Sequence, residues 1–374
     1  MRNPAIAPIP PRPSREVEGP ESLTPVVLLL ALAATISACS SNLESGDEES
    51  GLVTDLAAAG AAVTNLPDEP SASASSRFWS HWGDGRAEMN SYRATMSRYG
   101  EPREGELVLI YVTEPHDRRS WIKDDRVDSP HRVEVMKLNV SLDFLTGIYP
   151  YSVMTSVFSP VDDWGVERFQ PVKIGHTVQE WCGHYLHQVW SGREALRSLR
   201  MSYFPSDGEG ITEMDVRPGT LYEDALLIQL RELDGPFADG GDWEGWIVPS
   251  LWTVRRGAAT PEPGRGTITR DELRAESDAG APVTRFTLRY HDYWREYDVE
   301  SEPPGKILGW RTSLGDTVRL AESLRSPYWT ENDPDGRRLR VELGLSPTSS
   351  GVPPVAGASP GPSTSPPPGG GGGC

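Results

Sequence analysis

The stretch VEVMKLNVSLDF, residues 133–144, decides the fold because its side chains alternate between apolar and polar. One set of alternate positions carries Met136, Leu138, Val140, Leu142 and Phe144, and only Glu134 falls outside this pattern. The positions between them carry Lys137, Asn139, Ser141 and Asp143. A period of two is typical of a β-strand with one face in a core and the other toward solvent. The stretch therefore predicts a half-buried strand.

Other stretches outside this strand also favour β-structure. The run ELVLIYVTE, residues 106–114, is apolar on both faces and predicts a central strand. Upstream of it, Gly100 to Gly105 separate two strand-like runs within residues 89–114, which is a hairpin signal. YPYSVMTSVF, residues 149–158, alternates like residues 133–144, and residues 283–313 predict two strands joined by a Pro-containing turn.

Helix signals are fewer. The spacing of the apolar residues predicts a helix over residues 220–233, where Thr220 and Glu223 have the spacing of a capping box. GREALRSLR, residues 192–200, is a shorter helix candidate. We therefore expect a mainly β (α+β) protein, in which a curved antiparallel sheet or half-barrel wraps one or two helices.

Composition divides the chain into four parts. All 31 aromatic residues lie between Phe78 and Trp329, which predicts one β-rich globular domain over residues 77–345. Residues 39–76 are small, acidic and free of aromatic side chains, so they predict a disordered tether. Residues 346–374 are rich in Pro, Gly and Ser and predict a disordered tail, while residues 1–38 form a signal region.

The signal region predicts lipid attachment at Cys39. The apolar run from Val26 to Ala38 has 13 residues, too few for a membrane-spanning helix, which needs about 20. It ends in Ile-Ser-Ala-Cys, residues 36–39, which looks like a bacterial lipoprotein signal that is cut before the cysteine to be acylated. Ser40 follows Cys39, as in lipoproteins sorted to the outer membrane. The alternatives are an ordinary secretory signal and a buried helix with a chance cysteine, and the balanced charges ahead of Val26 fit a signal poorly.

The formal net charge of −18 restricts the partners. Binding to a nucleic-acid backbone needs clustered Lys and Arg, so the charge argues against nucleic acid as a partner. It also argues against adhesion to anionic lipid headgroups. A soluble, self-repelling surface is the expected consequence, and a surface that collects cations is the alternative.

QEWCGHYLH, residues 179–187, holds the candidate chemistry. Read as one long strand, residues 172–190 place Glu180, Cys182 and His184 on one face and His187 on the other. These three side chains are a candidate ligand or thiol site, although a zinc site normally needs three or four ligands. Gly183 permits a bulge or a close backbone approach. A buried structural cysteine is the favoured interpretation, and we expect no catalytic residue, no metal and no cofactor.

A second cluster, FWSHWGDGRAE, residues 78–88, gathers Trp79, His81, Trp82 and Asp84 just before the first predicted strand. An aromatic plug that closes one end of the sheet is the expected role of this cluster.

Three stretches carry a family resemblance: residues 89–114, residues 137–160 and QEWCGH, residues 179–184. There the chain resembles uncharacterised bacterial secreted proteins and lipoproteins that often carry the label "septum formation inhibitor Maf". True Maf nucleotide pyrophosphatases have a Ser-x-x-Arg-Arg-like loop, whereas this chain has only the reversed order in DRRSW, residues 117–121. No Maf catalytic residue therefore carries over. The strand pattern also loosely resembles the half-barrel of periplasmic lipoprotein carriers.

Two functions follow as expectations. The first is a membrane-anchored, non-catalytic lipoprotein of the bacterial envelope, which binds an apolar ligand such as a lipid, or a partner protein, on its curved sheet. The second is an envelope enzyme or metal protein that uses Cys182 and His184.

Overall fold

The computed structural model describes residue 64 and residues 66–164, 168–233, 241–257, 261–273 and 282–347. They all belong to one compact unit, Leu52–Cys374. The signal region with Cys39, most of the predicted tether and residues 348–374 lie outside the described residues. None of the helices in the described ranges is long and apolar enough to cross a membrane.

The first half of the sheet is an antiparallel meander. Its strands in chain order are β1 (Ala87–Arg98), β2 (Glu101–Asp117), β4 (Arg132–Thr146), β5 (Tyr149–Pro160), β6 (Lys173–Glu180), β7 (Gly183–Ser191), β8 (Ala195–Ser202) and β9 (Gly210–Asp215). The short β3 (Ile122–Lys123) pairs with β2. β4 contains the alternating stretch, and its Met136, Leu138, Leu142 and Phe144 are buried as predicted.

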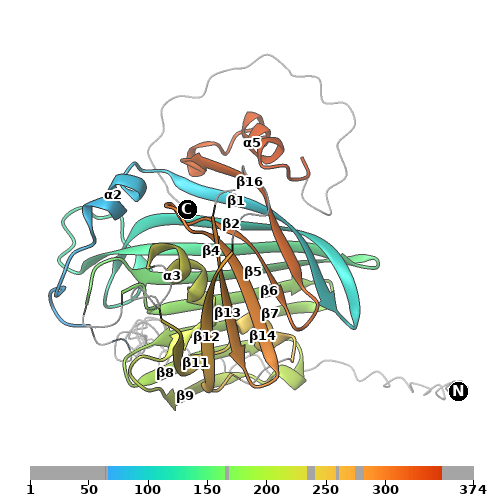
Figure 1. Cartoon of the computed structure of the whole chain (residues 1–374), viewed down its shortest axis with the longest axis horizontal. Coiled ribbons are helices and arrows are strands. Elements are labelled where there is room, and N and C mark those ends of the chain that lie inside the picture. Colours follow the sequence, from blue (N-terminus) through green and yellow to red (C-terminus); the bar gives the residue numbers. More distant parts are fainter. Residues whose placement is uncertain are drawn as a thin grey trace, which may run out of the picture. The chain divides into compact units, whose positions relative to one another are not determined.

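The second half is another meander, which pairs with the first through β16 and β1. Its strands are β11 (Trp243–Val248), β12 (Gly264–Leu273), β13 (Val283–Tyr290), β14 (Tyr293–Glu300), β15 (Ile307–Thr312) and β16 (Thr317–Ser326), with β10 (Leu221–Tyr222) parallel to β11. The edges of the sheet are β9 and β10, which follow each other in the chain. The sheet curls over, so that β12–β14 pass in front of β5–β7 in Figure 1.

The concave side of the sheet encloses two short helices. In α3 (Leu226–Glu232) every residue from Leu226 to Arg231 is buried. Leu226, Leu227, Ile228 and Leu230 make most of the helix surface apolar, which is typical of an interior helix, and Tyr111 of β2 donates a hydrogen bond to the Leu227 carbonyl at 3.0 Å. The second helix is α4 (Leu251–Arg255). The predicted curved sheet around one or two helices is therefore confirmed.

Two helices lie near the ends of the domain. α2 (Ser76–Trp82) starts at a Ser75 cap, whose hydroxyl accepts the Phe78 N–H at 3.2 Å. α5 (Arg337–Glu342) follows β16, and the Leu343 carbonyl after it accepts a hydrogen bond from Ser91 at 2.6 Å.

Two helix predictions need correction. Residues 195–202 form β8 because they pair with β7 and β9; Leu196 and Ser198 are buried on one face, whereas Leu199 and Met201 lie on the other. The predicted helix 220–233 is shorter, and Glu223 does not complete a capping box with Thr220. The Thr220 hydroxyl donates to the Arg217 carbonyl, and Glu223 reaches across to α4.

The packed domain also begins before residue 77. The sequence assigns residues 39–76 to the tether, but Thr64 accepts a hydrogen bond from the Trp121 indole at 2.7 Å. Ala72 and Asp163 form a β-bridge, and Leu66 packs against a second small core cluster.

Candidate functional site

The predicted site around Cys182 is a hairpin turn. β6 ends at Glu180 and β7 begins at Gly183, so Trp181 and Cys182 form the two-residue turn between them. The prediction of one long strand is wrong here. Glu180 is buried, whereas Cys182 and His184 are exposed.

The turn leaves the thiol without an activating partner. The Glu180 carboxylate accepts the Cys182 backbone N–H at 2.8 Å and raises the pKa of the Cys182 thiol. A nucleophilic cysteine needs a lowered pKa and an electropositive setting. The buried, structural cysteine is also wrong as a prediction, because the side chain lies in solvent.

Gly183 confirms the expected close approach. A Cβ at this position would lie 2.6 Å from Cγ of Tyr203, closer than a side chain can stand. The Tyr203 ring, which follows β8, therefore covers the hairpin backbone.

The turn also brings two histidines together. His176 of β6 is opposite His187 of β7, and both are buried, so His187 does not lie on the far face as predicted. The His176 ring is 2.9 Å from the Thr155 hydroxyl through Nδ1. Burial lowers the pKa of His176 to about 3 and that of His187 to about 4, so both are neutral.

A buried polar cluster lies between the two halves of the sheet. Glu223 accepts hydrogen bonds from the hydroxyls of Tyr290 and Tyr293, at 2.8 and 3.2 Å, and pairs with Arg295 at 3.1 Å. It also accepts the backbone N–H of Ser250 at 2.9 Å, just ahead of α4. Asp224 accepts the N–H of Leu251 at 3.0 Å, and burial raises its pKa to about 6. The two carboxylates thus fix the start of α4 inside the sheet.

The space beside this cluster is small. The cavity measures about 60 Å³, and its wall includes Glu223, Arg256, Asp316 and Trp310. At roughly 15 Å³ per water position, it would accommodate about four waters. This cavity, which lies among the described residues, is therefore too small for an acyl chain.

A much larger space lies at the α2 end of the sheet. This groove measures about 910 Å³. It is bounded by α2, by the C-terminal end of α3 and by the turn between β14 and β15. Its lining residues include Arg77, Phe78, Ser80, His81, Trp82, Arg168, Arg231, Glu232, Glu300, Glu302, Pro304 and Gly305.

A network of charges fixes the floor of the groove. Arg231 of α3 donates to both carboxylate oxygens of Glu88 in β1, at 2.8 and 3.3 Å. Burial alone would raise the pKa of Glu88, but the charge and hydrogen bonds of Arg231, together with hydrogen bonds from Asn90 and His81, lower the pKa to about 2. His81 lies 3.1 Å from the same carboxylate through Nε2, and burial lowers its pKa.

Glu232 is a hydrogen-bond acceptor in the floor of the groove. One of its oxygens accepts the Trp82 indole N–H at 3.1 Å and lies 3.2 Å from Nε of Arg231. Burial raises the pKa of Glu232 even though Arg231 opposes it. The residues of this floor were missed at the sequence level, although the charged pair Arg231–Glu232 at the end of an apolar helix was an available signal. The aromatic plug was expected, and Trp82 is buried at this end of the sheet.

Metal chemistry has little support in this geometry. Across the described ranges, no group of three or more His, Cys, Asp or Glu side chains is placed to hold a metal ion. Glu180, Cys182 and His184 come close in sequence, but two of them point into solvent.

Comparison with known proteins adds one distant structural similarity. No protein-family model and no curated protein sequence matches the chain. A solved structure, a β-barrel-like protein of a domain of unknown function (DUF1849) from Brucella abortus, is similar with a TM-score of 0.39 and 9% sequence identity. The similarity covers 64% of this chain and 98% of that one.

Proposed function

We propose that this protein is a lipid-anchored, non-catalytic protein of the bacterial envelope that binds a peptide segment of a partner in the groove beside α2. The observation that carries the proposal is the groove itself. Ligand sites typically measure about 300–1,000 Å³, so a groove of about 910 Å³ is large enough, whereas the interior cavity of about 60 Å³ is not.

The charges of the groove favour a peptide segment that carries both acidic and basic side chains. Arg77 on α2 and Arg168 before β6 are basic, whereas Glu300 and Glu302 at the turn after β14 are acidic. An acyl chain could form no hydrogen bond with these charged groups, so covering them would cost free energy. A peptide can pair with them and also use Glu232 as an acceptor for its backbone N–H groups.

The floor supports binding because it is rigid before a ligand arrives. Arg231 is held by Glu88, Glu232 and the Pro304 carbonyl, at 3.2 Å for the last. A preorganised site loses less conformational entropy on binding.

Photo-crosslinking in cells tests this function. A photoreactive amino acid at Ser80 or Ser301, two exposed residues of the groove wall, should form adducts with a peptide that mass spectrometry identifies. The control position is Ser323, an exposed serine of β16 outside the groove. The adducts should weaken with Arg77→Glu. Equal adducts at Ser323, or none at Ser80 and Ser301, would remove the proposal.

The anchor is proposed from the sequence alone. Labelled palmitate should enter the wild type at Cys39 and not the Cys39→Ala variant, and the labelled protein should fractionate with the outer membrane, as Ser40 suggests. Several acyl chains anchor a protein stably, whereas one chain does so only marginally. Equal labelling of both proteins would rule the anchor out.

A further inference from the structure

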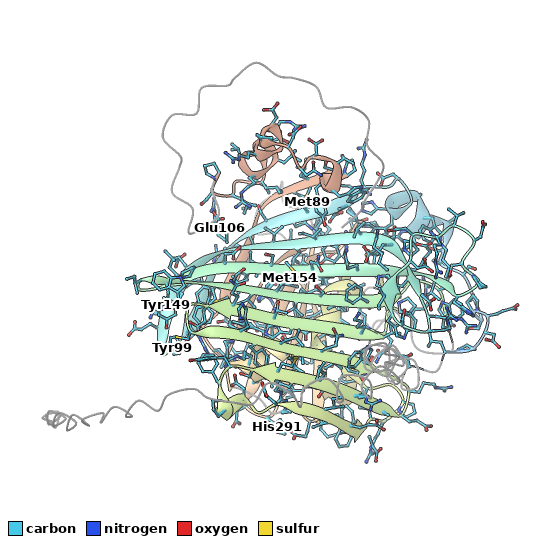
Figure 2. The ribbon with its side chains drawn as sticks, turned by 180° about the vertical axis from the view of Figure 1, so that it is seen from behind. Met89, Tyr99, Glu106, Tyr149, Met154 and His291 are labelled. Atoms are coloured by element: carbon cyan, nitrogen blue, oxygen red, sulfur yellow. The ribbon has the colours of Figure 1, made fainter. Side chains whose placement is uncertain are left out.

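Four hairpin turns lie together at one end of the sheet. They join β1 to β2 at Tyr99, β4 to β5 at Ile148, β6 to β7 at Trp181 and β8 to β9 at Tyr203. Alternate turns of an antiparallel meander share an end, and the register agrees, since Gly105 is opposite Phe144 and Tyr185 is opposite Ser202. Figure 2 shows Tyr99 and Tyr149 side by side at this end.

Each of these turns exposes a large apolar side chain. The exposed fractions are 61% for Tyr99, 78% for Ile148, 67% for Trp181 and 66% for Tyr203. Single exposed apolar residues are ordinary on a protein surface, but four at adjacent turns form a patch. Met154, which is also exposed, lies in the middle of the sheet, away from Tyr99 and Tyr149 (Figure 2).

Ring contacts join these side chains into one band. Tyr99 and Tyr151 share a hydrogen bond between their hydroxyls at 2.6 Å. The Tyr149 ring lies 6.0 Å from that of Tyr151 and 6.3 Å from that of Trp181. Tyr203 packs on Gly183, directly after this turn. We call the surface that these turns share the aromatic rim; it consists of the exposed Tyr99, Ile148, Trp181 and Tyr203 and the half-buried Tyr149, with Tyr151 buried beneath them.

The side chains of the rim are uncharged, and the turns around them hold no basic cluster. Residues 98–101, 145–150 and 180–184 together contain one Arg and two Glu, and one of these, Glu180, is buried against the Cys182 backbone. In the fourth turn, Asp207 lies 3.3 Å from Arg255, and the exposed Glu209 accepts the Ser202 N–H at 3.3 Å. A net charge of −18 repels anionic headgroups, so attraction at the rim has to come from apolar surface.

From these observations we propose that the aromatic rim inserts into the headgroup region of a lipid bilayer. Trp and Tyr are enriched at membrane interfaces because their rings are apolar and their N–H and O–H groups can stay hydrated. Because the four hairpin turns lie at the same end of the sheet, they can enter the membrane interface together. Ile148 is the most exposed apolar side chain among them. The contact needs neither acylation at Cys39 nor the groove, so it is separable from the proposed function.

Vesicle sedimentation tests the rim with the full chain carrying Cys39→Ser and Cys374→Ser. This protein should bind zwitterionic phosphatidylcholine vesicles, with an affinity that neither anionic lipid nor high salt increases. Trp181→Ser or Ile148→Ser should weaken the partition roughly tenfold, since each removes one apolar side chain from the contact. The matched control is Trp329→Ser, which removes an exposed tryptophan outside the rim and should leave binding unchanged.

Cys182 provides a second measurement on the same protein. It lies in the third turn and is exposed, so an environment-sensitive fluorophore attached there should shift to the blue when phosphatidylcholine vesicles are added. Failure to bind, binding only to anionic vesicles, or equal binding by the Cys39→Ser/Cys374→Ser protein with and without Ile148→Ser would overturn the proposal. In that case the rim would be a surface for a protein partner.

Discussion

Individual residues show which parts of the structure can be predicted from the local sequence. The apolar positions of β4 were predictable because a period of two can be read over a dozen residues. The surroundings of Cys182 were not predictable, because the chain reverses direction in a hairpin turn at this point. The turn exposes Cys182 and places His187 opposite His176. Gly183 was the signal for this turn, but the reason that only glycine fits is Tyr203, twenty residues away.

The two buried histidines should make stability depend on pH. Their pKa values of about 3 and about 4 lie below the unfolded value of about 6.5, so the unfolded state binds more protons. Their contribution is complete above pH 6.5 and is lost as the pH falls toward 4, by a few kcal/mol in total. Urea denaturation should show a flatter pH dependence for the double variant His176→Gln/His187→Gln.

The exposed His184 is the control for this experiment. His184→Gln should keep the wild-type slope, because folding leaves that side chain in solvent. An unchanged slope in the double variant would contradict the burial of the pair.

Cys182 should react with a maleimide in the native protein nearly as fast as in the unfolded protein. The side chain is exposed, although Glu180 raises its pKa and slows the reaction somewhat. Cys182→Ser should leave the denaturation midpoint unchanged. Protection of Cys182 in the native state, read by mass spectrometry, would mean that the turn is covered.

Among the secondary-structure elements, the interior helix depends on distant partners. The apolar run in residues 220–233 predicted a helix, but its bounds and its place inside the sheet follow from Tyr111, Glu88 and the second meander. Glu223 and Asp224 show the same limit, since they stabilise α4, which begins 27 residues later in the chain. Such contacts have no signature in local spacing; the charged pair Arg231–Glu232 could mark a site at the end of this helix, but the sequence did not indicate its partners Glu88 and Trp82.

The link between α3 and β1 should be costly to break. Arg231→Met leaves the Glu88 carboxylate buried without its main partner and should lower the free energy of unfolding by about 3–5 kcal/mol. The double variant Arg231→Met/Glu88→Leu should recover part of this loss, because both charges are gone. Urea denaturation of all three proteins gives the comparison.

An exposed ion pair serves as the control. Arg338→Met breaks the contact with Glu331 at the protein surface, where a salt bridge contributes about 0–1 kcal/mol. If Arg231→Met lowers the free energy of unfolding by no more than Arg338→Met does, the ion pair with Glu88 does not stabilise the position of α3.

For the molecule as a whole, composition predicted a globular domain over residues 77–345, and the structure adds packed residues ahead of it. The aromatic residues marked the core, whereas Thr64 and Leu66 join the domain from a stretch that looks like a linker. The pairing of β16 with β1, which unites the two meanders, joins residues far apart in the sequence. Local periodicity predicts strands but says nothing about which distant strands become neighbours.

Two truncations should show which C-terminal residues stabilise the domain. Removal of residues 348–374 should leave the melting temperature unchanged, because a sequence of Pro, Gly and Ser has little apolar surface to bury. Removal from residue 337 onward should lower it, because α5 and the buried Leu343 are lost together with the Ser91 hydrogen bond. Equal melting temperatures for the two proteins would mean that α5 does not stabilise the domain.

The central claim is that the ligand binds in the open groove and that no lipid occupies the interior of the sheet. Native mass spectrometry of the protein purified from its own membranes tests this most directly. The expected mass is the chain, with any acyl groups covalently attached at Cys39, and no lipid that is released on unfolding. A lipid retained without a covalent bond and lost only when the domain unfolds would contradict an interior filled by α3, α4 and the buried aromatic residues.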